Sequence, residues 1–131
     1  MPKKPALICI DDEKIVLDSL KDQLKNYFKD RVHLEVAENA EEGLEILQEL
    51  LEDGYSVKVI ISDWNMPKLS GDEFFLKIGP EYPSIKKILL SGEPDPTIMN
   101  RAKSKEFISK LVQKPWDSKE LIGLLEEYLT T

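Results

Sequence analysis

The sequence predicts an α/β fold in which helices cover both faces of one parallel sheet. Short apolar runs, several of them rich in β-branched residues, alternate with longer segments whose apolar residues recur at helical spacing. Five such strands alternate with five such helices, which is typical of a doubly wound sheet. The 131 residues fit one domain, and no linker, internal repeat or low-complexity segment is evident.

The strands are expected where apolar residues cluster. The run Ala6–Ile10 is continuously apolar, as in a parallel strand buried on both faces. The second run, Val32–Val36, alternates apolar and polar residues, which indicates an edge strand with one exposed side. Three further strands are expected at 57–62, 86–90 and 107–112.

The helices are expected where leucine and other apolar residues recur every three or four positions. They are expected at 13–28, from a cap at Asn39 to Asp53-Gly54, at 71–78, around 97–105 and at 117–129. The second helix should bury Leu44, Leu47 and Leu51. The helix at 97–105 has few apolar residues, so it should be the least firmly packed.

Composition limits the classes of partner. There are 25 acidic and 18 basic residues, and the net charge is −7, which argues against nucleic acid or an anionic membrane surface as the main partner. The single cysteine, Cys9, cannot form an internal disulfide, so a reducing, cytoplasmic setting is expected. No apolar stretch approaches the roughly 20 residues that span a bilayer, so we expect no membrane insertion.

Polar side chains stand at the carboxyl ends of four predicted strands. Asp11 and Asp12 follow the first strand, Asp63 ends the third, and Ser91 and Lys114 follow the fourth and fifth. In a parallel sheet these ends meet at one edge, where open α/β sheets bind their ligands. Because three crowded carboxylates repel one another, a divalent cation would stabilise them. Oxygen donors without histidine or cysteine favour Mg²⁺ or Mn²⁺.

The lysine and the serine are suited to a phosphoryl group. If the fifth strand lies two strands from the third, their backbones are about 10 Å apart, and a side chain as long as that of Lys114 is needed to cover the gap. The Ser91 hydroxyl can donate to another phosphoryl oxygen. With the metal and the lysine balancing charge, one carboxylate is free to act as a nucleophile. Asp63, central in the sheet, is the candidate.

Four motifs in this order resemble the response-regulator receiver domain of two-component signalling, over essentially the whole chain. They are Asp11-Asp12-Glu13, Asp63-x-x-Met66-Pro67-x-x-x-Gly71, Ser91-Gly92 and Lys114-Pro115-Trp116. The resemblance implies a flavodoxin-like sheet of order 2-1-3-4-5. It implies that Asp63 is phosphorylated by the phosphohistidine of a histidine kinase or phosphotransfer protein, or by a small phosphodonor. It also implies site roles for these residues: Mg²⁺ bound by Asp12, Asp63 and the Asn65 main-chain carbonyl, Asp11 acting through water, and Ser91 and Lys114 holding the phosphoryl oxygens.

The resemblance also predicts the output. The helix at 97–105, the strand at 107–112 and the helix at 117–129 would form the face that binds a downstream effector or a fused output domain, and this face could also form a homodimer. A cis peptide is expected before Pro115. Receivers commonly carry Tyr or Phe three residues before the lysine, where this chain has Leu111, so the aromatic half of the usual switch is missing. We expect a single receiver domain over 1–131, without an effector domain, that is a phosphoacceptor and not an enzyme.

Two other functions stay open at this point. A Mg²⁺-dependent phosphohydrolase would use the same Asp63, but phosphatases of the haloacid-dehalogenase type place a catalytic Asp two residues later, where this chain has Asn65, and no cap domain is present. A phosphorylation-independent pseudo-receiver would fit Leu111. Nucleotide binding is disfavoured because no glycine-rich loop follows the first strand. His33, the only histidine, is expected to be an ordinary surface residue.

Overall fold

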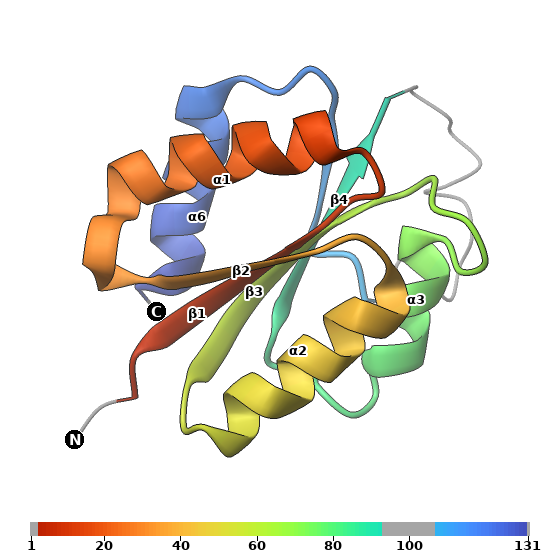
Figure 1. Cartoon of the computed structure of the whole chain (residues 1–131), viewed down its shortest axis with the longest axis horizontal. Helices are drawn as coiled ribbons and strands as arrows, with labels where there is room; N and C mark the ends of the chain where they lie inside the picture. The colour runs from red at the N-terminus through yellow and green to blue at the C-terminus, as the bar shows by residue number, and fades with distance from the viewer. Residues whose placement is uncertain (1–2, 93–106, 131) are drawn as a thin grey trace.

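The computed structural model describes residues 3–92 and 107–130, which form a five-stranded parallel sheet with helices on both faces (Figure 1). The strands are β1 (Pro5–Ile10), β2 (His33–Ala37), β3 (Ser56–Asp63), β4 (Lys86–Ser91) and β5 (Lys110–Gln113). The helices are α1 (Lys14–Phe28), α2 (Ala40–Glu52), α3 (Gly71–Ile78) and α6 (Ser118–Leu129), with a short 3₁₀ helix (Lys29–Arg31) after α1. The sheet order β2-β1-β3-β4-β5 confirms the predicted flavodoxin-like topology.

One expected helix lies outside the described residues, and one expected strand starts later than predicted. The helix expected at 97–105 lies outside the described residues, so four α-helices are described where five were expected. The last strand starts at Lys110, so the prediction that it begins at residue 107 was wrong. Just before the strand starts, Ser109 bonds Lys87 through both its main chain and its side chain. Its N donates to Lys87 O, and its Oγ accepts from Lys87 N at 2.9 Å. The Phe107 ring packs on Gly79, where a Cβ atom would lie 2.3 Å from the ring.

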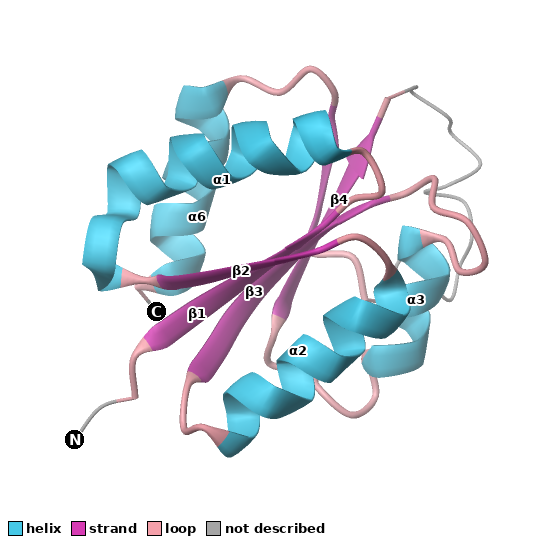
Figure 2. Cartoon of the chain, in the orientation of Figure 1, coloured by secondary structure: helices cyan, strands magenta, loops and turns pink. Residues whose placement is uncertain are grey.

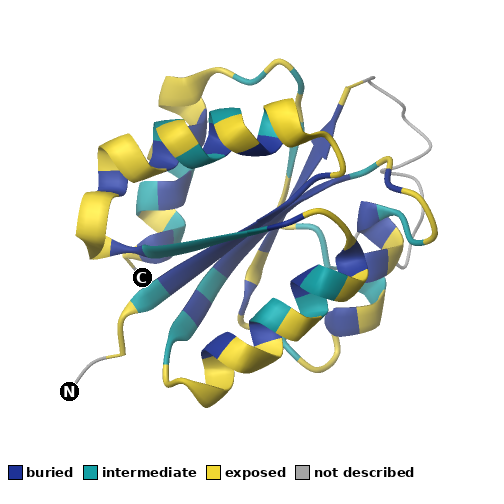
Figure 3. Cartoon of the chain, viewed as in Figure 1, coloured by how far each residue is buried: buried dark blue, intermediate teal, exposed yellow. Residues whose placement is uncertain are grey.

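Each face of the sheet buries its own apolar cluster (Figures 2 and 3). One cluster packs α2 and α3 against the sheet, and the other packs α1 and α6. Strands β1, β3 and β4 contribute residues to both clusters, which explains their continuous apolar runs. In α2 the expected burial of Leu51 was wrong: it is 37% exposed, and the neighbouring Leu50 is buried instead.

Local signals in the sequence fix where the elements begin and end. Strand β2 lies at the edge of the sheet, as its alternating pattern predicted. Asn39 caps α2, because its Oδ1 accepts from Glu42 N at 2.8 Å, and Asp117 caps α6 in the same way. Among residues 3–92 and 107–130, no helix has the length and apolar character that crossing a membrane requires.

Candidate functional site

Asp63 lies at the carboxyl end of the central strand β3 and is 4% exposed. The chain then turns sharply, because Trp64 N donates to Leu90 O of β4 at 2.8 Å and Gly71 N donates to Trp64 O at 2.9 Å. This turn brings Gly71 so close to the strand end that a Cβ atom there would lie 2.2 Å from Asp63 O. Asp63 is therefore held by both its strand and the turn that follows.

The two acids after β1 have different environments. Asp11 is fully buried, and its Oδ1 accepts from Glu13 N at 2.9 Å, whereas Asp12 is exposed. One carboxylate oxygen from each of Asp11, Asp12 and Asp63 can be chosen so that all three lie within 4.8 Å of one another. The sequence therefore predicted correctly that these three acids meet at one edge of the sheet.

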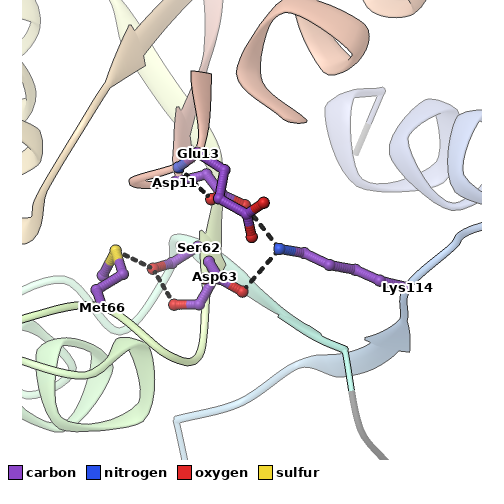
Figure 4. A network of polar contacts seen from close by, with 6 residues as sticks. All are labelled: Asp11, Glu13, Ser62, Asp63, Met66 and Lys114. Atoms are coloured by element: carbon purple, nitrogen blue, oxygen red, sulfur yellow. Dashed lines mark hydrogen bonds and ion pairs between the residues drawn. The ribbon is translucent and has the colours of Figure 1, made fainter. Parts of the chain in front are cut away.

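Lys114 joins two of these acids from the far side of β4 (Figure 4). Its Nζ lies 2.9 Å from Asp11 Oδ2 and 2.9 Å from Asp63 Oδ1. Its main-chain N donates to Ser91 O at 2.7 Å, which fixes the point where the chain leaves the sheet. The strand order places β4 between Asp63 and Lys114, so the long lysine side chain crosses that strand, as the sequence predicted. The peptide before Pro115 is cis, as the resemblance implied.

The electrostatics of the site reflect burial and crowding. Burial raises the pKa of Asp63 above its ordinary value, and the charges of Asp11 and Asp12 raise it further, while the hydrogen bond and charge of Lys114 act in the opposite direction. Burial alone would lower the pKa of Lys114, but its bonds to Asp11 and Asp63 outweigh this and raise it. Lys114 therefore stays a cation. Its single positive charge does not balance the carboxylates of Asp11, Asp12 and Asp63 when all three are ionised.

The residues present fit a hard divalent cation. A cavity of about 480 Å³ opens beside the acids and is lined by Asp12, Glu13, Asp63, Trp64, Asn65, Gly92 and Lys114. The donors available there are carboxylate and carbonyl oxygens, which Mg²⁺ prefers. Each Asp11 oxygen has a protein partner, Glu13 N for Oδ1 and Lys114 Nζ for Oδ2, and Asp63 Oδ1 also contacts Lys114 Nζ.

The other residues that the sequence singled out lie at different distances from this cavity along the chain, and of them Trp64 lines it. Ser91 is buried at the end of β4, next to Gly92 of the cavity wall. Leu111 is half-buried in β5, pairs with Leu89 and packs on the cluster beneath α2 and α3. Trp64 lines the cavity, and its buried Nε1 has no hydrogen-bond partner. His33 lies in the edge strand β2 with 30% of its side chain exposed, and its ring stacks on a tyrosine at 4.5 Å and bonds a glutamate at 2.7 Å.

Two positions near the site were missed by reasoning from the sequence. Ser62 is fully buried, and its Oγ donates to the Asp63 carbonyl oxygen at 3.0 Å. Its place before Asp63 on a buried strand was the available signal, because a polar residue inside an apolar strand needs a partner. Gln23 bonds the loop after β5, and nothing in the polar face of α1 distinguishes it from its neighbours.

The sequence and the fold are similar to those of known proteins. The chain is 31% identical over 127 residues to a chemotaxis protein CheY homolog of Campylobacter jejuni, covering 95% of this chain and 92% of that protein. It is 26% identical to the hydrogenase transcriptional regulatory protein HoxA of Cupriavidus necator and 34% identical to the transcriptional regulatory protein MctR of Rhizobium johnstonii, covering 95% and 86% of this chain. It spans only 24% and 46% of those two longer proteins.

Solved structures give the same result. The signal receiver domain of an HD domain-containing protein from Pseudomonas fluorescens Pf-5 superimposes with a TM-score of 0.83 at 27% identity, covering 98% of this chain and 96% of that one. A response regulator receiver domain protein from Clostridium thermocellum gives 0.80 at 28% identity, covering 96% and 94%. The family model of the response regulator receiver domain matches residues 7–126, from the middle of β1 into the last turns of α6. The chain therefore belongs to the response regulator receiver domain family.

Proposed function

We propose that Asp63 is the phosphoacceptor of this receiver and takes its phosphoryl group from the phosphohistidine of a histidine kinase or phosphotransfer protein, or from a small phosphodonor. The observation that best supports this is the position of Lys114, whose Nζ reaches across β4 to lie 2.9 Å from both Asp11 and Asp63. A lysine held beside a buried carboxylate is a charge placed where the oxygens of a transferred phosphoryl group would lie.

The proposed reaction transfers a phosphoryl group from the donor histidine to Asp63. One of its carboxylate oxygens attacks phosphorus in line with the leaving group, the new oxygen–phosphorus bond forms, and the phosphorus–nitrogen bond of the donor histidine breaks. The bonding electrons leave with the imidazole nitrogen. Lys114 then contacts a phosphoryl oxygen, and the Ser91 hydroxyl donates to another.

The metal assignment rests on the donor set. Asp12, Asp63 and the Asn65 main-chain carbonyl would hold Mg²⁺, or Mn²⁺ in its place, with Asp11 acting through water. When bound, the ion neutralises charge on the carboxylates and on the incoming phosphoryl oxygens. Asp11 meanwhile orients Lys114 through its Oδ2.

The remaining assignments concern partners and the extent of the protein. The described part of the output face would be formed by β5 and α6, which would bind a downstream effector or fused output domain and could form a homodimer; the helix expected at 97–105 lies outside the described residues. Residues 1–131 would act as a receiver domain in the cytoplasm, without direct nucleic-acid binding or membrane insertion. Phosphorylation and slow loss of the phosphoryl group would be its only chemistry.

The test is intact mass after incubation with acetyl phosphate and Mg²⁺. Wild type should gain one phosphoryl group in a Mg²⁺-dependent way, and Asp63→Asn should gain none. Asp22→Asn, which changes an exposed acid of α1, is the matched control and should behave as wild type. An adduct on Asp63→Asn at the wild-type rate would contradict the assignment. Repeated turnover of a phosphomonoester at ordinary enzymatic rates would support the phosphohydrolase instead.

A further inference from the structure

A hydrogen bond ties the segment after β5 to the middle of α1. The indole Nε1 of Trp116 donates to Gln23 Oε1 at 3.0 Å, across 93 positions of sequence. The Gln23 amide in turn donates from Nε2 to Ser19 Oγ, one turn earlier in the helix, at 3.1 Å. The Trp116 ring is half-buried against the apolar cluster that α1 and α6 share. The bond is therefore partly shielded from water, and its acceptor is oriented by a second bond.

Trp116, the donor of this hydrogen bond, follows Lys114 by two residues. Strand β5 is four residues long, lies at the edge of the sheet and has no fully buried residue, so beyond the bond from Lys114 N to Ser91 O the sheet does not hold the segment that follows. A lysine side chain loses rotamer entropy when it is held in one position, and Lys114 must cross β4 to place Nζ on Asp63. A segment free to shift would let Nζ leave Asp63, because a displacement of about 1 Å is enough to misalign a catalytic group.

We propose that Trp116, through its hydrogen bond to Gln23, is a positioning residue that keeps Lys114 aligned with the phosphoryl group on Asp63. This inference rests on the proposed function of Asp63. Trp116 acts through the course of the main chain and not by contact with the reacting atoms. Helix α1 begins directly after Asp11 and Asp12, so the bond joins the two chain segments that carry the acids and the lysine.

The test compares Trp116→Phe, which removes the N–H donor, with Gln23→Met, which removes the acceptor at nearly constant length. The rate of phosphorylation by acetyl phosphate at saturating Mg²⁺ should fall about 2- to 12-fold in each, the range set by the net free energy of one hydrogen bond. The double variant should fall no further than the slower single variant, because both changes remove the same bond. Mg²⁺ affinity should stay at the wild-type value, since the three acids are untouched. Trp64, in the cavity wall, provides the fluorescence signal for that titration.

Glu126→Gln is the matched control. It breaks the ion pair of Arg31 with Glu126, 2.8 Å long, which also joins the α1 side to α6 but lies away from Lys114. This variant should phosphorylate at the wild-type rate. Additive losses in the double variant, a wild-type rate in Gln23→Met, or an equal loss in Glu126→Gln would overturn the positioning role while leaving Asp63 as the phosphoacceptor. A wild type that gains no phosphoryl group would overturn the proposed function and this inference together.

If Trp116→Phe fails to fold, the result is decided by Gln23→Met, which keeps the indole ring in place. Urea unfolding of each variant separates a structural role from a positioning role. A merely structural role would lower the urea midpoint without changing the phosphorylation rate of the folded fraction.

Discussion

Replacing Lys114 with methionine should destabilise the fold as well as abolish its role in phosphoryl transfer. The change keeps a long apolar stem and removes the charge from two contacts of 2.9 Å. At an effective dielectric constant of about 20, each contact is a gross attraction of about 6 kcal/mol. Most of this attraction is cancelled by the cost of removing the charges from water. Removing one partner of a buried ion pair typically costs about 3–5 kcal/mol, because the other charge is left buried without a partner. We expect a loss of that size in the free energy of unfolding without Mg²⁺.

The assay is urea unfolding of Lys114→Met beside Lys110→Met, which removes an exposed lysine from β5, the strand that precedes Lys114. The control should change the free energy of unfolding by under about 1 kcal/mol, as is usual for surface charges. Saturating Mg²⁺ should shrink the loss in Lys114→Met, because the ion supplies positive charge to the same carboxylates. A loss no greater than that of the control, or one that Mg²⁺ leaves unchanged, would refute the argument that Lys114 balances a buried acid pair.

Four further predictions concern Gly71, Gly123, Lys87 and Cys9. Gly71→Ala should lower the free energy of unfolding by about 1–3 kcal/mol and slow phosphorylation, because its Cβ would lie 2.2 Å from Asp63 O. Gly123→Ala in α6 should instead raise the free energy of unfolding by about 0.5–1 kcal/mol in the same urea assay, because the added Cβ would meet no atom within 4 Å. Burial lowers the pKa of Lys87, so between that pKa and the ordinary 10.5 the unfolded chain holds more protons. The stability of wild type relative to Lys87→Met should therefore rise with pH in this window, and urea midpoints that stay parallel would contradict it. Burial raises the pKa of the Cys9 thiol to about 12, so a thiol reagent should label it only after urea unfolds the chain.

The site could be predicted from the sequence because its residues lie at the carboxyl ends of parallel strands. Once Asp11 and Asp63 are placed at the ends of parallel strands, topology alone brings them together, and no knowledge of side-chain packing is needed. Lys114 could be predicted for the same reason, since only its length was required to cross one strand. Asp12 shares a strand end with Asp11, but the sequence did not indicate which of the two is buried.

The features that the sequence did not predict depend on contacts between distant segments. The start of β5 depends on Ser109 meeting Lys87 and on Phe107 packing against a glycine after α3, and neither meeting leaves a periodic pattern. Burial of Leu50 in place of Leu51 depends on how α2 is rotated on the sheet, which the spacing of leucines leaves ambiguous by one position. The bond of Trp116 to a glutamine in α1 joins two otherwise ordinary positions.

The charge of the site explains why it can respond to phosphorylation. Asp11, Asp12 and Asp63 carry three negative charges when ionised and Lys114 carries one positive charge, so the remaining charge of −2 is what one divalent cation balances. Because the pKa of Asp63 is raised in the folded state, its ionisation lowers stability as the pH rises from 3.8 through the raised value, and Mg²⁺ should oppose that loss. A phosphoryl group carries about −1.5 to −2 where the carboxylate carried −1, so it restores an excess of negative charge. If Asp63 is phosphorylated as proposed, we expect hydrogen-bond donors to move toward the new group, with the hydroxyl of Ser91, at the end of the neighbouring strand β4, among them.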